Sequence, residues 1–178
     1  WPPVSSEIDP GSITHPNTDV LVERGKKVCS AFFGESFTFG DSMATTIKSV
    51  GEQRFSYDNF SYRMNNNLGG HFSRLLDTDY LLKAVPGQSN ASILMGLESS
   101  IEYLSNTYDK VYVVVQLTET GRDWKRESAR SGELLALRGN SFYDYFVNYE
   151  NWFSDKLNKL QEQYPNCEFI VWRNFTRW

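Results

Sequence analysis

The sequence predicts a single α/β domain, built on a parallel sheet with helices on both faces. Apolar runs typical of strands alternate with segments of helical periodicity, in the order strand, helix, strand, helix, strand, helix, strand. The strand runs are almost continuously apolar, which is typical of strands covered on both sides. The chain has 178 residues and 40% hydrophobic content, which suits one domain with a sizeable core.

Each expected element rests on its own pattern. Residues 1–25 are rich in Pro, Ser, Thr, Asp and Asn and lack periodicity, so we expect an extended arm there and the α/β domain over 26–178. Ser89 or Asn90 is placed to cap the second helix. The charged segment 118–139 is long for a loop, which predicts that it is functional or partly helical. The predicted strands are 28–33, 80–85, 111–117 and 167–172, and the predicted helices are 60–76, 91–104 and 143–163.

Composition excludes several classes of function. The net charge is −4 and no run of Lys or Arg occurs, so a nucleic-acid partner is not favoured. No apolar stretch reaches the ~20 residues of a membrane span, which predicts a soluble chain. No signal peptide is visible, although one could have been removed, and the compartment is undetermined. A start at Trp1 rather than Met favours a processed or partial chain.

A metal or cofactor site is not expected. Cys29 and Cys167 each lie in an apolar segment, which predicts two buried core residues, with a disulfide between them as the open alternative. With two cysteines and two histidines in the whole chain, the usual zinc ligand sets are hard to assemble. No glycine-rich dinucleotide or phosphate motif is present either.

The most informative stretch follows the first predicted strand. The apolar run from Val28 to Phe33 ends in Gly34-Glu35-Ser36-Phe37-Thr38-Phe39-Gly40, a turn that carries one serine directly after an acid. Parallel sheets bind ligands at the carboxyl ends of their strands. This context predicts Ser36 as a nucleophile, and the alternative is a serine that only caps a helix or shapes a turn.

These residues carry a family resemblance. Gly34-Glu35-Ser36-Phe37-Thr38 resembles the first motif of the SGNH, or GDSL-type, hydrolases, which is Gly-Asp-Ser followed by a hydrophobic residue and Ser or Thr. The segment 84–90, Ala-Val-Pro-Gly-Gln-Ser-Asn, resembles the second motif of that family. The resemblance covers roughly residues 26–175. It implies a three-layer, flavodoxin-like fold and a hydrolase of esters or acyl groups.

The resemblance also implies roles for individual residues. Ser36 would be the nucleophile, and its backbone N–H and that of Gly87 would form two arms of the oxyanion hole. Glu35 stands where the family has aspartate and would shape the turn. Thr38 and Asp41 lie near enough in sequence to order the loop.

Two departures from the family pattern leave the activity open. The third motif normally supplies an asparagine amide to the oxyanion, but residues 118–123 here are Thr-Glu-Thr-Gly-Arg-Asp. Arg122 or Asn90 is the candidate replacement. The last motif, Asp-x-x-His, is absent from the sequence. His71 is expected to be a surface or packing residue, which leaves His15 in the arm as the candidate base.

Three explanations of the missing base stay open. The chain could be a fragment whose absent C-terminal part carries the Asp and His, the arm could supply His15, or the domain could have lost catalysis. The first gives a serine esterase with an unknown ester substrate, such as a glycan acetyl ester, a lipid ester or a thioester. The last gives an inactive structural or binding subunit of a larger assembly. The arm and the aromatic segment 172–178 are the expected contact sites for a protein partner.

Overall fold

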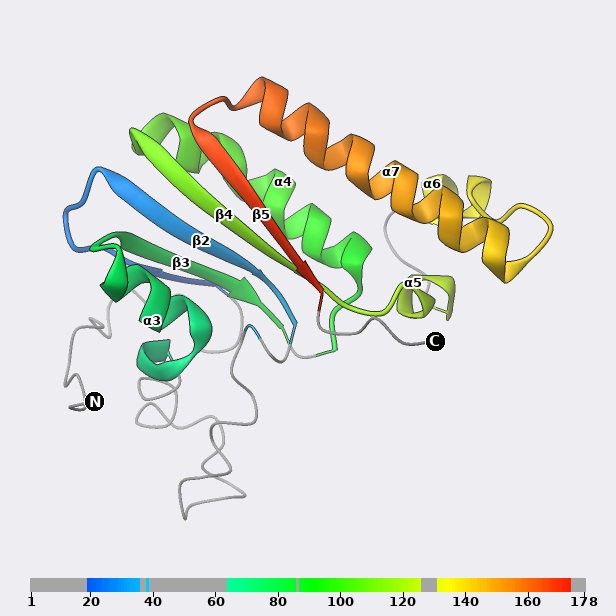
Figure 1. Ribbon diagram of the computed structural model, residues 1–178, viewed down its shortest axis with the longest axis horizontal. Helices are drawn as coiled ribbons and strands as arrows, with labels where there is room; N and C mark the ends of the chain where they lie inside the picture. Colours follow the sequence, from blue (N-terminus) through cyan, green and yellow to red (C-terminus); the bar gives the residue numbers. More distant parts are fainter. Residues whose placement is uncertain (1–18, 36–37, 39–63, 86, 126–130, 174–178) are drawn as a thin grey trace, which may run out of the picture.

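The computed structural model describes residues 19–35, 38, 64–85, 87–125 and 131–173. Within this part of the chain, five strands form one sheet in the order β1-β3-β2-β4-β5 (Figure 1). Strands β2, β3, β4 and β5 are parallel, and β1 pairs antiparallel with β3. The strands are β1 (Asp19–Val22), β2 (Val28–Gly34), β3 (Asp79–Ala84), β4 (Lys110–Leu117) and β5 (Cys167–Arg173).

The predicted α/β class is confirmed, but the expectation of a purely parallel sheet is wrong. Strand β1 falls inside the segment expected to be an arm, and Leu21 pairs with Leu81 at the edge of the sheet. Val20 and Val22 are both buried, so this short run belongs to the core. A strand of four residues is too short to show a clear alternation of apolar and polar residues, so none was predicted there. Residues 1–18 lie outside the described part of the chain.

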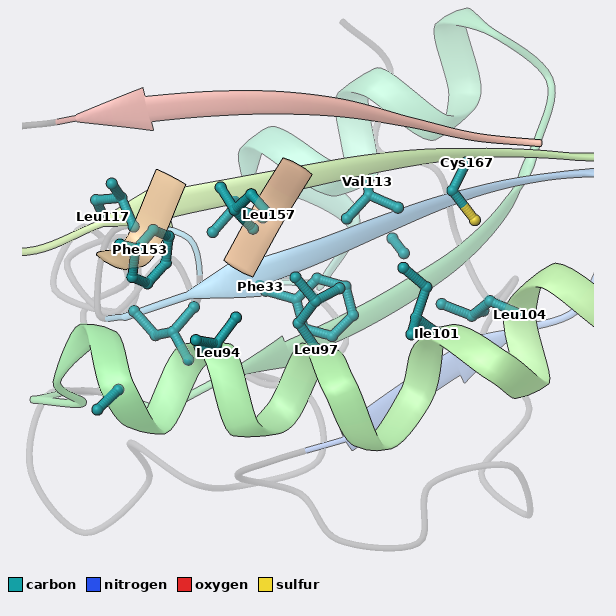
Figure 2. Packing of buried hydrophobic residues seen from close by; sticks show 14 of the residues in the cluster. Phe33, Leu94, Leu97, Ile101, Leu104, Val113, Leu117, Phe153, Leu157 and Cys167 are labelled. Carbon is teal, nitrogen blue, oxygen red and sulfur yellow. The ribbon is translucent and has the colours of Figure 1, made fainter. Parts of the chain in front are cut away.

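Helices pack on both faces of the sheet. Helix α3 (Leu68–Leu75) connects β2 to β3 and covers one face, while α4 (Asn90–Thr107) connects β3 to β4 and covers the other (Figure 1). The alternation along β2 shows this directly, because Phe32 packs with Phe72 and Tyr80 on the α3 side. Its neighbour Phe33 points into the cluster of α4 on the opposite side (Figure 2). The β2–β3 and β3–β4 crossovers therefore pass over opposite faces of the sheet.

Helix α3 is shorter than the predicted 60–76. Asn67 is its N-cap and accepts a hydrogen bond from the Gly70 N–H at 2.8 Å, so the helix begins at Leu68. Gly69 allows the helix to approach β3 closely, because a Cβ there would lie 2.5 Å from Tyr80 Cε2. Residues 60–63 of the predicted helix lie outside the described residues.

The segment between β4 and β5 contains α5 (Gly121–Lys125), α6 (Ser131–Ala136) and α7 (Phe142–Gln163). The expectation that 118–139 is partly helical is thus confirmed. Helix α7 lies on the same face as α4, and the two helices share one core cluster with β2 and β4 (Figure 2). Among the described residues, no helix is both long and apolar enough to cross a membrane.

Both cysteines are buried and free, so the expectation of two core residues is confirmed and the disulfide alternative is wrong. Burial, with a smaller effect of the Asp79 charge, raises the pKa of the Cys29 thiol to about 12. Burial also raises the pKa of Cys167 to about 11. Both side chains are therefore neutral thiols at physiological pH.

Candidate functional site at the carboxyl edge of the sheet

The carboxyl ends of β2, β3 and β4 meet at one edge of the sheet, next to α5 (Figure 1). Strand β2 lies between β3 and β4, and its crossover to β3 is on the α3 face. The crossover from β4 to β5 contains α7 and is on the opposite face, with α4. The loops that follow β2 and β4 therefore leave the sheet at a switch point in strand order. In open α/β sheets this is the place where ligands bind.

An ion pair bridges this switch point. Glu35, directly after β2, is 1% exposed, and its Oε2 lies 3.2 Å from Nη1 of Arg122 in α5. The same Nη1 donates to the backbone carbonyl of Gln88 at 3.4 Å. Arg122 thereby contacts the loops that follow β2 and β3 from its own position after β4. A buried carboxylate needs such a partner, so the ion pair fixes Glu35 at the edge.

A second link joins the β2 loop to β4. The Thr38 N–H donates to Oε1 of Gln116 at 2.8 Å, and the Thr38 hydroxyl donates to the same oxygen. Gly34 is packed against both residues, since a Cβ at this position would lie 2.7 Å from Thr38 Cβ and 3.0 Å from Gln116 Cβ. Only glycine fits between these two side chains without moving them.

The turn after β3 positions Gly87. The Gln88 N–H donates to the Val85 carbonyl at 3.1 Å, and Gln88 Oε1 accepts from the Val85 N–H at 3.3 Å. Gly87 has a φ of +80°, a left-handed conformation that favours glycine. In the described part of the chain, no atom outside its neighbours lies within 4 Å of a Cβ built there.

Asn90 holds two loops together. It is 2% exposed at the start of α4, where its Nδ2 donates to the Thr118 carbonyl at 3.0 Å. Its Oδ1 accepts from the Thr118 N–H at 2.7 Å. Both ends of the amide thus bind one residue of the β4 loop. Its role as an oxyanion donor stays a prediction.

A buried carboxylate lies at the N-terminus of α4. Asp123 is 3% exposed, accepts from the Ala91 N–H at 3.3 Å, and accepts from the Tyr149 hydroxyl at 2.7 Å. The negative charge stabilises the positive end of the α4 dipole. Burial and the Asp123 charge raise the pKa of Tyr149, which keeps this hydroxyl a donor. The network ties α5 to α4 and α7.

The predicted site residues divide into three groups. Gly87 and Asn90 both lie at the carboxyl edge, in the loops around the switch point. Ser36, His15 and Asp41 lie outside the described residues, although Glu35 and Thr38 on either side of the serine are described. His71 is exposed on α3, with its Nδ1 3.0 Å from Nη2 of Arg74, as expected for a surface residue.

His71 lies away from the carboxyl edge. The N-cap of its helix, Asn67, accepts a hydrogen bond from the Tyr80 hydroxyl at 3.0 Å. Tyr80 pairs with Ser30 in β2, four residues before Gly34. Four residues of strand correspond to roughly 13 Å, so α3 begins well back from the edge and His71 follows its start by one turn.

Gln116 and Asp123 are parts of this edge that were not predicted from the sequence. Gln116 is the polar residue within the apolar run Val113–Leu117, and a buried polar side chain in a central strand is a usable signal. Asp123 follows Arg122 in a charged segment and has no comparable signal, because its partners come from α4 and α7.

The described residues contain no group of three or more His, Cys, Asp or Glu side chains that could hold a metal ion. Comparison of the chain with protein-family models, with curated proteins and with solved structures yields no match.

Proposed function

We propose that the chain is a serine hydrolase of the SGNH type, with a flavodoxin-like three-layer fold and Ser36 as its nucleophile. The observation that carries the proposal is the fixed position of Glu35. This residue directly precedes Ser36, is buried, and is held across the switch point by Arg122. A serine next in sequence to such an anchored residue follows the central strand at the edge where ligands bind.

The proposed reaction follows acyl-enzyme chemistry. The Ser36 hydroxyl attacks the ester carbonyl carbon, and its proton passes to a base and then to the leaving alcohol. The backbone N–H groups of Ser36 and Gly87 stabilise the oxyanion. Water then attacks the acyl-enzyme, which releases the acid and restores the serine hydroxyl. His15 is the proposed base, and the substrate is an ester of a small molecule, glycan or lipid.

The second candidate is an SGNH-like domain without catalysis, which binds a protein partner. The observation that favours it is the pairing of polar groups at this edge among the described residues: Arg122 binds Glu35, and the Asn90 amide binds Thr118. His71, the one histidine among them, lies on α3. In this candidate the edge is a braced structural element, and Ser36 is a turn residue.

A fluorophosphonate probe separates the two candidates, because it reacts covalently only with an activated serine. We expect labelling of the intact chain, located on Ser36 by peptide mass spectrometry, and loss of labelling in Ser36→Ala. Ser99→Ala is the matched control, since Ser99 is an exposed serine on α4 that bonds to the Gly96 carbonyl. It should label like the unsubstituted chain.

A folded chain that stays unlabelled would refute the hydrolase proposal and favour the binding domain. Labelling at a different residue would also refute it. The role of His15 has its own variant: His15→Ala should lower the labelling rate by roughly 10²-fold or more if this residue is the base. An unchanged rate would place the base elsewhere.

A further inference from the structure

Gln116 is a buried amide whose presence the packing of the sheet does not explain. It is 1% exposed in the central strand β4, between Val115 and Leu117, which are both buried. Its Nε2 is buried and has no hydrogen-bond partner among the described residues. A buried unpaired donor is costly, and an apolar side chain of the same length would fill the space at lower cost. The amide of Gln116 must therefore be explained by the hydrogen bonds that its oxygen, Oε1, accepts.

The other atom holds the loop after β2. Oε1 of Gln116 accepts hydrogen bonds from both the N–H and the hydroxyl of Thr38. The orientation of the amide is fixed by chemistry, because a backbone N–H needs an acceptor and only Oε1 can accept. Thr38 is itself buried, so its N–H would otherwise lack a partner.

Glu35 and Thr38, on either side of Ser36 in the sequence, are bound to α5 and to β4, respectively. Glu35 is paired with Arg122, and Thr38 is bonded to Gln116. Gly34 is in contact with the Thr38 side chain, which brings the two ends of the five-residue segment 34–38 together. Only Ser36 and Phe37 lie between the two anchors.

We infer that Gln116 is a positioning residue, which holds Thr38, two residues after Ser36, against β4. The inference rests on the proposed function for the role of Ser36, but not for the anchoring of Thr38. Replacing Gln116 releases Thr38 from β4 and leaves Glu35 paired. A small displacement of a nucleophile lowers reactivity steeply, by roughly 10²-fold for 1 Å.

The test combines hydrogen exchange with fluorophosphonate labelling. Gln116→Met keeps the length of the side chain and removes the acceptor. We expect faster exchange at the Thr38 amide and a labelling rate lower by roughly 10- to 100-fold. Thr38→Val removes only the hydroxyl and serves if Gln116→Met fails to fold. It should lower the labelling rate, whereas Thr38→Ser, which keeps the hydroxyl, should restore it.

Thr78→Val is the matched control for loss of stability. Thr78 forms a buried hydroxyl–hydroxyl hydrogen bond of 2.7 Å with Ser30, in the half of β2 away from the edge. This variant should lower the melting temperature and leave both Thr38 exchange and Ser36 labelling unchanged.

Three results decide the matter. Unchanged exchange at Thr38 in Gln116→Met overturns the inference. An equal drop in labelling in Thr78→Val also overturns it, because general destabilisation would then explain the effect. Faster exchange at Thr38 in a chain that never labels supports the anchoring by Gln116 and refutes the hydrolase proposal, so the two failures are distinguishable.

Discussion

Removing Arg122 should leave the buried Glu35 carboxylate without the guanidinium that binds it at the switch point. The Glu35 side chain is 1% exposed and the Arg122 side chain is 28% exposed. Water can therefore solvate the guanidinium but not the carboxylate. Arg122→Met keeps much of the apolar stem and removes the guanidinium. The reverse variant, Glu35→Gln, removes the charge and leaves an amide oxygen that Arg122 can still bond to.

The magnitude follows from distance and burial. At 3.2 Å and an effective dielectric constant of ~20, the Coulomb attraction is about 5 kcal/mol before desolvation is subtracted. Removing one partner of a fully buried pair costs about 3–5 kcal/mol, and an exposed pair contributes about 0.2–1 kcal/mol. With one partner buried and the other partly exposed, Arg122→Met should lower the free energy of unfolding by about 2–3 kcal/mol.

Urea unfolding of the two single variants and the double variant Glu35→Gln/Arg122→Met measures the coupling. We expect the double variant to be more stable than additivity predicts by about 1–2 kcal/mol, since it contains no buried carboxylate that has lost the Arg122 guanidinium. Lys26→Met is the matched control, because Lys26 bonds to Asp77 at 2.6 Å in an exposed pair and should lose less than about 1 kcal/mol. A coupling below about 0.5 kcal/mol would refute the argument that the pair supports Glu35.

Two glycines at positive φ and one buried thiol give the remaining predictions. Gly87→Ala and Gly25→Ala both place a Cβ at positive φ, +80° and +71°, and no described atom beyond the neighbouring residues lies within 4 Å of either Cβ. Each should cost about 1–2 kcal/mol of stability by the strain of the left-handed conformation. Only Gly87→Ala should slow fluorophosphonate labelling, because Gly25 precedes β2 at the other end of the strand; equal labelling in both would count against Gly87 as an oxyanion donor. The second prediction concerns Cys29, whose pKa burial raises to about 12 in the folded chain, so the unfolded chain loses its thiol proton first as the pH rises. The free energy of unfolding should therefore decrease between pH 9 and 12, and Cys29 should contribute up to about 1.4 kcal/mol per pH unit to this decrease. In Cys29→Ala, the urea midpoint should fall less steeply with pH over pH 9–10 than in the unsubstituted chain. An identical slope in the two chains would contradict this assignment.

The strands and long helices were predictable because burial and periodicity are local properties of the sequence. Strand β4 was expected over 111–117 and spans Lys110–Leu117, and helix α7 was expected over 143–163 and spans Phe142–Gln163. Both are long enough for their apolar pattern to be unambiguous. The errors lie where local signals compete: Asn67 caps α3 inside a continuous apolar stripe, and β1 is too short to show an alternation.

The candidate site was only partly predictable, because its contacts join residues far apart in the sequence. Glu35 and Arg122 were both noted in the sequence, one as an acid shaping the turn and the other as a candidate oxyanion donor. The structure pairs them with each other. Gln116 and Thr38 are 78 residues apart, and no local pattern connects them.

This pairing changes what a loss of activity in an Arg122 variant would mean. Arg122 is bonded to Glu35, and Glu35 directly precedes Ser36, so its removal acts on the serine through the loop as well as through any charge offered to an oxyanion. The double variant Glu35→Gln/Arg122→Met separates these effects, because it removes the buried carboxylate while the guanidinium stays absent. If Arg122 acts only by neutralising the buried Glu35 charge, labelling should recover in the double variant along with stability. If it stabilises the oxyanion, stability should recover and labelling should stay low, as expected for a group whose charge acts on the transition state.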